Sequence, residues 1–316
     1  MEPRSSISSS DLAPTPAFWI GAATALVLGG AFFWVAGWDG SSPAAAGFAN
    51  LRREAYRFNA ANGARHSQVV LLGTSRMRHG VIEEDLAEKL GPTWQAVNLG
   101  LDSAGLGEVA RLAESLNAGR SYKDNVAVIE VHPAEFDRGA CRLPPKASPW
   151  GGLWPARRAL SLWLTDLYYG PLARALRLPV PAPLPRLLWT VDAEARRRAV
   201  ARMTPEALAA SAKSWSFDGT CVEALSETVQ ALKERGFRVV LLETPSAAAW
   251  ARALPSLSAY KAAVLDPKTT GADAVVSFPD ARSLGAGEGV FYDYSHLSPE
   301  GAALQTRLLA DALQKP

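Results

Sequence analysis

Apolar runs and amphipathic stretches alternate along most of this chain, and their pattern predicts its secondary structure. Five runs have the length and the valine- and leucine-rich character of buried strands. They span residues 69–73, 94–100, 126–131, 238–243 and 274–278. Continuously apolar runs are typical of parallel strands that are covered on both faces. Four stretches with helical periodicity lie between and after the runs, at residues 82–90, 106–117, 222–235 and 299–313.

This order of elements predicts an α/β fold over residues 66–316. We expect a three-layer α/β/α sandwich around a central, mainly parallel five-stranded sheet. Ligands of such folds bind at the carboxyl ends of the strands. The segments that directly follow the strands are therefore the first candidates for chemistry.

One segment near the N-terminus is apolar over its whole length. No charged residue lies between Asp11 and Asp39, and the apolar stretch at residues 17–38 is 22 residues long. About 20 apolar residues in a helix cross the hydrocarbon core of a bilayer. Tryptophans at both ends, Trp19, Trp34 and Trp38, suit the membrane interfaces. We therefore predict an uncleaved single-pass transmembrane anchor.

The surroundings of this segment leave alternatives open. Small residues at 43–47 would suit cleavage of a signal peptide, although the apolar part is longer than the usual 7–15 residues. A buried helix of a globular domain is a second alternative. Residues 1–16 form an N-terminal tail and residues 39–65 a linker with a lead-in helix. The flanking arginines do not decide the orientation.

The alternation of strands and helices is interrupted by a predicted helical insertion at about residues 142–215. Residues 142–202 hold eleven Arg and Lys but three Asp and Glu, with four of the ten tryptophans. Arginine with tryptophan favours a cap or a membrane-facing surface, and a solvated amphipathic cap is the alternative. Cys141 and Cys221 bracket this insertion. In an oxidising compartment they could form a disulfide at its base, and two buried thiols are the alternative.

The composition excludes several classes of protein. With 48% hydrophobic and 20% charged residues among 316, the chain is too apolar to be intrinsically disordered. A net charge of +2 provides no global footprint for nucleic acid. Two cysteines are too few for a disulfide scaffold or a four-thiolate zinc site. Because no histidine pair has metal-ligand spacing and no glycine-rich phosphate loop is present, we expect neither a metal nor a nucleotide cofactor.

Three short segments at the ends of predicted strands could carry chemistry. Gly-Thr-Ser at residues 73–75 follows the first strand, where a helix N-terminus would favour developing negative charge. Small residues at 98–105, after the second strand, allow close approach of a ligand. Near the C-terminus, Asp293 precedes His296 by three residues. That spacing lets the carboxylate accept from Nδ1 while Nε2 faces a nucleophile.

Together these segments resemble the conserved blocks of the SGNH (GDSL-like) hydrolase superfamily. Residues 73–75 stand where that family has Gly-Asp-Ser, residues 98–100 match the second block, and residues 293–296 match the closing Asp-x-x-His. The resemblance covers about residues 66–136 and 236–313 and implies a flavodoxin-like α/β fold. It makes Ser75 the nucleophile, His296 the general base and Asp293 its orienting group. The Ser75 backbone N–H would be one oxyanion donor.

The chain departs from that family in its remaining oxyanion donors. Ser103 stands where the family has a second-block glycine, and residues 131–135 lack the third-block asparagine. Loss of one such donor typically costs about 100–1000-fold in rate. The candidate oxyanion or substrate-binding residues are therefore Ser75, Asn98, Gly100, Ser103, His132 and Arg76. Arg76 and His79 could bind an anionic substrate or, alternatively, cap the helix or lie on its face.

An N-terminal anchor before a degenerate SGNH domain resembles the membrane-anchored DltD and AlgJ/AlgX type. Such proteins assist O-acylation of cell-envelope polymers beside a multi-pass membrane acyltransferase. The resemblance implies a serine esterase or O-acyltransferase on the extracytoplasmic (periplasmic) side, acting on acyl esters of a polysaccharide or envelope polymer. One alternative is a catalytically weak envelope component that binds glycan or an acyltransferase partner. Another is a free-standing lipase or thioesterase.

Overall fold

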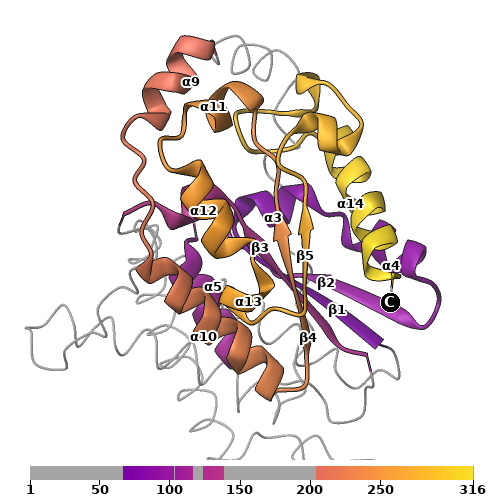
Figure 1. Cartoon of the computed structure of the whole chain (residues 1–316). Helices are drawn as coiled ribbons and strands as arrows, with labels where there is room; N and C mark the ends of the chain where they lie inside the picture. Colours follow the sequence, from indigo (N-terminus) through magenta and orange to yellow (C-terminus); the bar gives the residue numbers. More distant parts are fainter. Residues whose placement is uncertain (1–66, 103, 117–123, 139–203, 316) are drawn as a thin grey trace, which may run out of the picture.

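The computed structural model describes residues 67–102, 104–116, 124–138 and 204–315. These residues form an α/β domain around a five-stranded sheet of order β2-β1-β3-β4-β5, in which every neighbouring pair is parallel (Figure 1). The strands are β1 (Ser67–Leu72), β2 (Trp94–Asn98), β3 (Val126–Val131), β4 (Arg238–Glu243) and β5 (Ala274–Ser277).

Helices connect and cover these strands. The α-helices are α3 (Ser75–Gly80), α4 (Glu83–Leu90), α5 (Leu106–Ser115), α9 (Pro205–Ala212), α10 (Thr220–Glu234), α11 (Ala248–Ala253), α12 (Leu257–Val264), α13 (Pro267–Thr270) and α14 (Pro299–Leu313). The short 3-10 helices are η2 (Pro133–Phe136), η5 (Ala281–Leu284) and η6 (Glu288–Val290).

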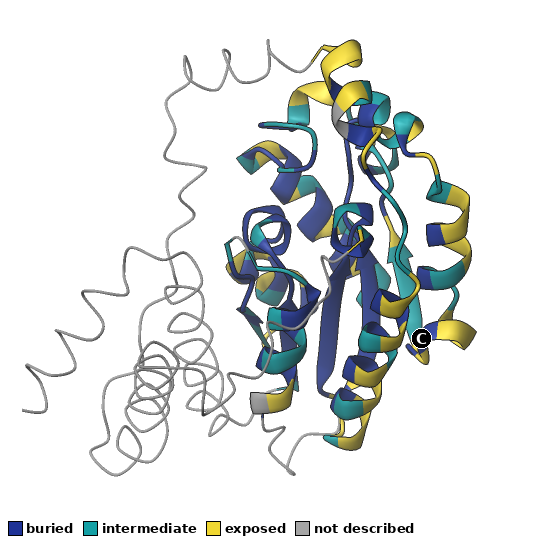
Figure 2. Ribbon diagram, turned by 90° about the vertical axis from the view of Figure 1, so that its left-hand side faces the viewer, coloured by how far each residue is buried: buried dark blue, intermediate teal, exposed yellow. Residues whose placement is uncertain are grey.

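Each strand contributes side chains to two hydrophobic cores because successive residues of a strand point to opposite faces. Val69 and Leu71 of β1 pack with α3, α4 and α14, whereas Val70 and Leu72 pack with α5, α10, α11 and α12. Figure 2 shows the central strands buried between helices whose outer faces are exposed, whereas the edge strands β2 and β5 are mostly only partly buried. The sheet is therefore covered on both sides, which explains its continuously apolar strands.

The structure confirms the predicted five-stranded parallel sheet with flanking helices. The four predicted helices correspond to α4, α5, α10 and α14, with ends shifted by no more than two residues. The periodicity did not predict α11 and α13, which have six and four residues. Such short helices do not complete enough turns to produce a recognisable repeat.

The predicted insertion begins and ends at one place beside the sheet. Asp137 and Phe217 form an isolated antiparallel bridge, and the Asp218 N–H donates to the Phe136 carbonyl at 2.9 Å. Helix α9 falls within the range expected for the insertion, and most of the rest, residues 139–203, lies outside the described residues. Cys221 is fully buried and disulfide-bonded. Cys141, the other cysteine of the sequence, lies outside the described residues.

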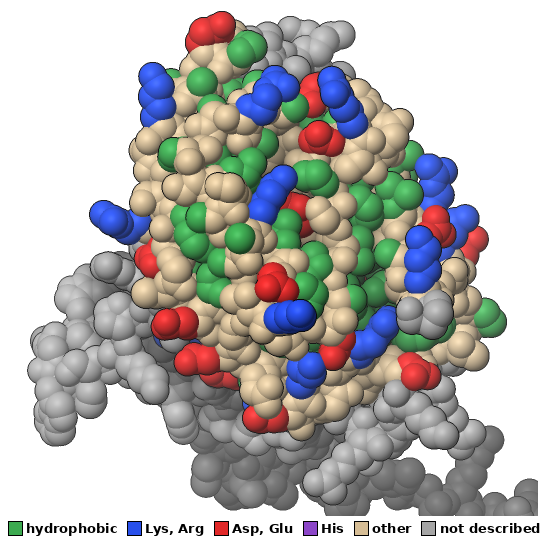
Figure 3. Space-filling view, in the orientation of Figure 1, with side chains coloured by type: hydrophobic (Ala, Val, Ile, Leu, Met, Phe, Trp, Pro, Cys, Tyr) green, Lys and Arg blue, Asp and Glu red, His purple; other side chains and the backbone are tan. Residues whose placement is uncertain are grey.

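The predicted anchor at residues 17–38, the tail before it and the linker after it also lie outside the described residues. Within the described part of the chain, no helix is both long enough and apolar enough to cross a bilayer. On the face shown in Figure 3, Lys and Arg side chains are interspersed with Asp and Glu side chains. This face therefore carries mixed charge.

Candidate active site

The structure brings together the three residues that the sequence singled out for chemistry. Ser75 Oγ lies 2.7 Å from His296 Nε2, and His296 Nδ1 lies 2.7 Å from Asp293 Oδ2. Ser75 is the first residue of α3, which follows β1. Asp293 and His296 precede α14, and His296 is 221 positions from Ser75 in the sequence. Ser75 and His296 are only partly buried. A substrate can therefore reach both side chains.

A buried carboxylate on the neighbouring strand shapes the turn that carries Ser75. Glu130 of β3 accepts hydrogen bonds from the Thr74 N–H at 2.7 Å, the Thr74 hydroxyl at 3.0 Å and the Met77 N–H at 3.0 Å. It also accepts from Arg76 Nε at 2.8 Å. These bonds satisfy N–H groups at the start of α3 that the helix itself leaves unpaired. Within the described residues, the Ser75 backbone N–H donates to no other group.

Two glycines allow the close approaches on which this turn depends. A Cβ atom at Gly73 would lie 2.4 Å from Glu130 Oε2, so any larger residue would displace the carboxylate. A Cβ atom at Gly100 would lie 2.5 Å from the backbone nitrogen of Arg78. Gly73 is thus required by the adjacent Glu130 side chain, and Gly100 by the adjacent Arg78 backbone.

The Asp293 carboxylate holds the loop that carries His296 and also orients the His296 ring. Asp293 Oδ1 accepts from the backbone N–H groups of Ser295 and His296, each at 2.8 Å. An antiparallel bridge between Phe291 and Leu297 closes the loop at its base. The other oxygen of Asp293 is thereby aimed at the imidazole.

Electrostatics keep Asp293 charged and select one histidine tautomer. Burial acts to raise the pKa of Asp293, but hydrogen bonding to the His296 side chain and the neighbouring N–H groups outweighs it, so the pKa is lowered. A carboxylate accepts only, so we assign the Nδ1 proton of His296 to this bond. Nε2 is then free to accept the Ser75 hydroxyl proton, as a general base must.

The second-block residues have structural partners in this arrangement. The Asn98 amide donates to the carbonyls of Met77 at 3.0 Å and Val81 at 2.8 Å, and its oxygen accepts from the Gly100 N–H at 3.0 Å. Both amide protons of Asn98 and the N–H of Gly100 are therefore engaged away from any oxyanion. Ser103, the other candidate donor of this block, lies outside the described residues.

Arg76 and His132 are also engaged inside the protein. Arg76 is 7% exposed and forms ion pairs with Glu130 and Glu135. His132 is fully buried, lies 2.8 Å from Ser246 Oγ through Nε2 and accepts from the Ala134 N–H through Nδ1. In this structure both side chains are thus engaged by groups of the protein around the site.

A second histidine–aspartate pair lies beside the first. His79 Nε2 is 3.4 Å from Asp102 Oδ1, and the His79 ring meets the His296 ring edge-on with centroids 6.3 Å apart. Burial acts to raise the pKa of Asp102, but the nearby His79 side chain and the charge of Arg78 lower it overall. His79 is 1% exposed, so it is a buried residue and not one on the surface of its helix.

Glu130 and Asp102 are the site residues that sequence reasoning did not find. A detectable signal existed for Glu130, since a lone acidic residue within the apolar run Val126–Val131 must find buried partners. Asp102 had no such signal because its partners come from α3. No group of three or more potential metal ligands occurs within the described residues.

The similarity of this chain to known proteins is distant. No protein-family model matches the sequence, and no curated protein matches it. A solved structure described as "a putative lipolytic protein of G-D-S-L family" from Desulfitobacterium hafniense DCB-2 is similar at 13% sequence identity and a TM-score of 0.39. The match covers 78% of this chain and 99% of that one. At this level of similarity, the chemistry has to be inferred from the site itself.

Proposed function

We propose that this protein is a serine-dependent acyl-ester enzyme of the SGNH type. The observation that carries the proposal is the unbroken relay from Ser75 Oγ through the imidazole of His296 to Asp293, with 2.7 Å at each step. Nucleophile, base and orienting carboxylate in this geometry activate a serine hydroxyl for attack on an acyl carbon.

The reaction follows from the positions of the protons. Ser75 Oγ attacks the ester carbonyl while its proton passes to His296 Nε2, and the tetrahedral oxyanion lies against the Ser75 backbone N–H. His296 then returns the proton to the departing alcohol, which leaves an acyl-enzyme. Water, or a sugar hydroxyl in a transferase, attacks that ester with His296 again as the base. Asp293 stays ionised throughout and stabilises the imidazolium.

We further propose that residues 17–38 anchor this enzyme in a membrane, with the catalytic domain on the extracytoplasmic side. The disulfide at Cys221 supports this placement because structural disulfides persist in oxidising compartments. An acylated glycan or envelope polymer would be the substrate and a multi-pass O-acyltransferase the partner. Retention of the full-length chain in membranes after alkaline carbonate extraction tests the anchor.

One observation favours a second candidate, a component that needs a partner for activity. Ala134 and its neighbours provide no side-chain amide where the family resemblance expects one, and Asn98 already engages the Gly100 N–H. A site with so few oxyanion donors would be slow in isolation. The purified protein would then turn over simple esters only when the partner is present.

Turnover of p-nitrophenyl acetate by the full-length protein tests the proposal. We expect hydrolysis that falls by roughly 100- to 10,000-fold in Ser75→Ala, His296→Ala and Asp293→Asn. Ser295→Ala is the matched control, because the Ser295 hydroxyl has no partner among the described residues. Equal turnover in Ser75→Ala and the wild type would refute the serine mechanism.

A further inference from the structure

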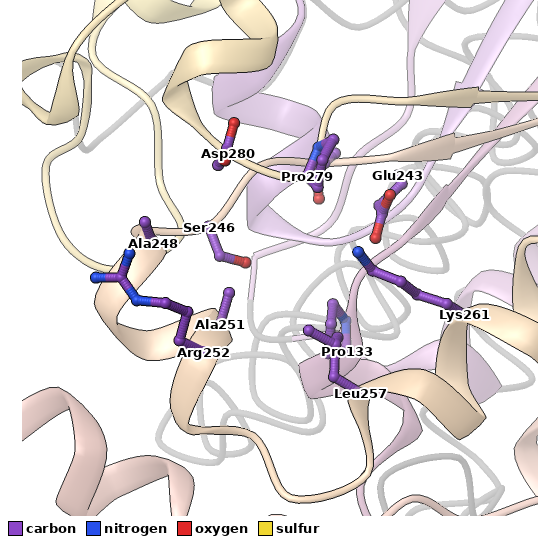
Figure 4. Close-up of a pocket in the computed structure, with 11 residues that line it drawn as sticks. Pro133, Glu243, Ser246, Ala248, Ala251, Arg252, Leu257, Lys261, Pro279 and Asp280 are labelled. Atoms are coloured by element: carbon purple, nitrogen blue, oxygen red, sulfur yellow. The ribbon is translucent and has the colours of Figure 1, made fainter.

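A cavity lies at the carboxyl ends of β4 and β5. Its volume is about 250 Å³, and its polar lining comes from Glu243, Thr244, Ser246, Arg252, Lys261 and Asp280 (Figure 4). None of the triad residues lines it. The ester chemistry of the triad therefore assigns no role to the groups that line it.

The Ser246 hydroxyl is a donor that is oriented into this cavity. Burial, with the nearby charges of Arg76 and His296, holds the pKa of His132 well below its ordinary value, so the imidazole is neutral. Its Nδ1 accepts from the Ala134 N–H, which leaves the ring proton on Nε2. Nε2 therefore donates to Ser246 Oγ, and the hydroxyl proton of Ser246 has to find another acceptor. Figure 4 shows this hydroxyl pointing into the cavity.

This tautomer also excludes a second nucleophile. Because His132 Nε2 donates to Ser246, it has no lone pair with which to accept the serine proton. Ser246 is therefore not activated as a nucleophile, and its hydroxyl can only form hydrogen bonds.

The charged ends of Lys261 and Glu243 lie on the same side of the cavity (Figure 4), and no ion pair between them is found among the described residues. The Glu243 carboxyl is instead bonded to the Ser277 hydroxyl. A ligand group that contacts both side chains must accept a hydrogen bond from the Lys261 ammonium and donate one to a Glu243 carboxyl oxygen. A hydroxyl does both. A carboxylate or phosphate has no proton to donate to Glu243, and a charged amine has no lone pair to accept from Lys261.

Another polar side chain of the lining also has an unused hydrogen-bonding group. Thr244 Oγ1 is buried and has no hydrogen-bond partner among the described residues, which is costly unless a ligand or water meets it. Arg252 and Asp280 also belong to the lining, but Figure 4 shows both side chains pointing away from its centre, and the Asp280 carboxylate accepts from the Ser283 N–H at the start of η5. Hydroxyls spaced around a small ring can meet Glu243, Thr244, Ser246 and Lys261 without a net charge.

We propose that this cavity binds a single uncharged sugar residue, with one ring hydroxyl between Lys261 and Glu243 and another accepting from Ser246. The binding goes beyond the ester chemistry of Ser75 and does not depend on it.

Saturation-transfer NMR on the full-length protein tests this site, with D-glucose, D-galactose and N-acetyl-D-glucosamine as probes in the absence of sugar-based detergents. Inorganic phosphate and glycine serve as competing ionic probes. The variants are Lys261→Met and Ser246→Ala. Lys268→Met, at an exposed position of α13, is the matched control, and Ser75→Ala separates this site from the ester site.

We expect saturable binding of at least one sugar to the wild type, to Lys268→Met and to Ser75→Ala. Its affinity should fall at least tenfold in Lys261→Met and in Ser246→Ala. Should Ser246→Ala fail to fold, because it leaves the buried His132 N–H without an acceptor, the exposed Lys261→Met carries the test alone. Absence of saturable sugar binding, equal binding in Lys261→Met, loss of binding in Ser75→Ala, or displacement of the sugar by phosphate or glycine would each overturn the proposal.

Discussion

At the scale of single residues, Ser75, the proposed nucleophile, depends on a carboxylate of the neighbouring strand. Glu130 receives hydrogen bonds from Thr74, Arg76 and Met77, the residues that surround Ser75 in the chain. It does not contact the reacting atoms, so it is a positioning residue. Its negative charge, buried to 3% exposure, is compensated by these donors and by the Arg76 guanidinium.

Glu130→Gln should therefore impair catalysis more than binding. In this variant an NH₂ group replaces one carboxylate oxygen. This donor cannot accept from the N–H groups that shape the turn, so we expect Ser75 to move relative to His296. We expect kcat for p-nitrophenyl acetate to fall at least tenfold with KM nearly unchanged, in a protein that circular dichroism shows to be folded. Glu135→Gln is the control, since Glu135 pairs with the same arginine but does not touch the turn. Equal kcat in the two variants would contradict the positioning role.

Glu243 predicts a pH-dependent stability of a definite sign. Burial raises its pKa, against the opposing effects of the Ser277 hydroxyl and the Lys261 charge. The folded state then holds its proton more tightly than the unfolded state, whose carboxyl titrates near about 4.3. This residue's contribution to stability is present at low pH and is lost as pH rises through the folded-state pKa.

Glu243→Gln, which does not titrate, should accordingly gain stability relative to the wild type as pH rises. Urea denaturation of both proteins at pH 4, 6 and 8 measures this difference in the free energy of unfolding. Glu206→Gln, on the exposed surface of α9, is the control. A difference that stays constant or shrinks with rising pH would show that the assigned sign is wrong.

At the scale of elements, the two ends of the triad are held by the helices that they adjoin. Ser75 is the first residue of α3, and His296 comes shortly before α14, whose N-cap is Ser298. The Ser298 hydroxyl accepts from the Gly301 N–H at 3.3 Å, and Pro299 follows at a position where its missing N–H is harmless. We therefore expect formation of α14 and placement of His296, the proposed general base, to be coupled.

Ser298→Ala should lower the free energy of unfolding by about 1 kcal/mol, the usual cost of a lost N-cap. Because the cap lies two residues after His296, kcat should fall as well. Thr204→Ala is the comparison, since it removes the N-cap of α9, a helix that carries no triad residue. We expect it to shift the urea midpoint similarly and leave kcat unchanged. A kcat loss of the same size in both variants would argue against the coupling.

The elements differ in how far the sequence predicts them. Strands such as β3 and β4 are predictable to the residue because burial on both faces leaves a continuous apolar run. Helices of six residues, α3 and α11, have too few turns for a periodic signal. The roles of Asn98 and His132 were beyond prediction for another reason. Asn98 bonds to the carbonyls of Met77 and Val81, and His132 bonds to the Ser246 hydroxyl, and only the folded chain brings these partners near. The pairing of Asp293 with His296 was visible in the sequence because a three-residue spacing lets the carboxylate reach the imidazole.

At the scale of the whole molecule, one covalent bond joins a core helix to another part of the chain. Cys221 lies in the first turn of α10, is fully buried and is disulfide-bonded. The ends of the predicted insertion meet just before it, where Asp137 pairs with Phe217. A disulfide here restricts the unfolded chain and so stabilises the domain.

Cys221→Ala should lower the free energy of unfolding by roughly 2–5 kcal/mol. Thermal melts of the wild type with and without dithiothreitol provide the parallel measurement, and reductant should reproduce most of the loss. The melting temperature of the variant should not respond to reductant. A wild type that is equally insensitive would contradict a stabilising disulfide.

The central claim is that Ser75 is an activated nucleophile. Its most direct test is reaction of the full-length protein with a fluorophosphonate probe, followed by peptide mapping by mass spectrometry. We predict a single adduct on Ser75, absent in Ser75→Ala, strongly slowed in His296→Ala and unchanged in Ser295→Ala. An adduct on another residue, or none on a folded wild type, would contradict the assignment of this site to serine ester chemistry.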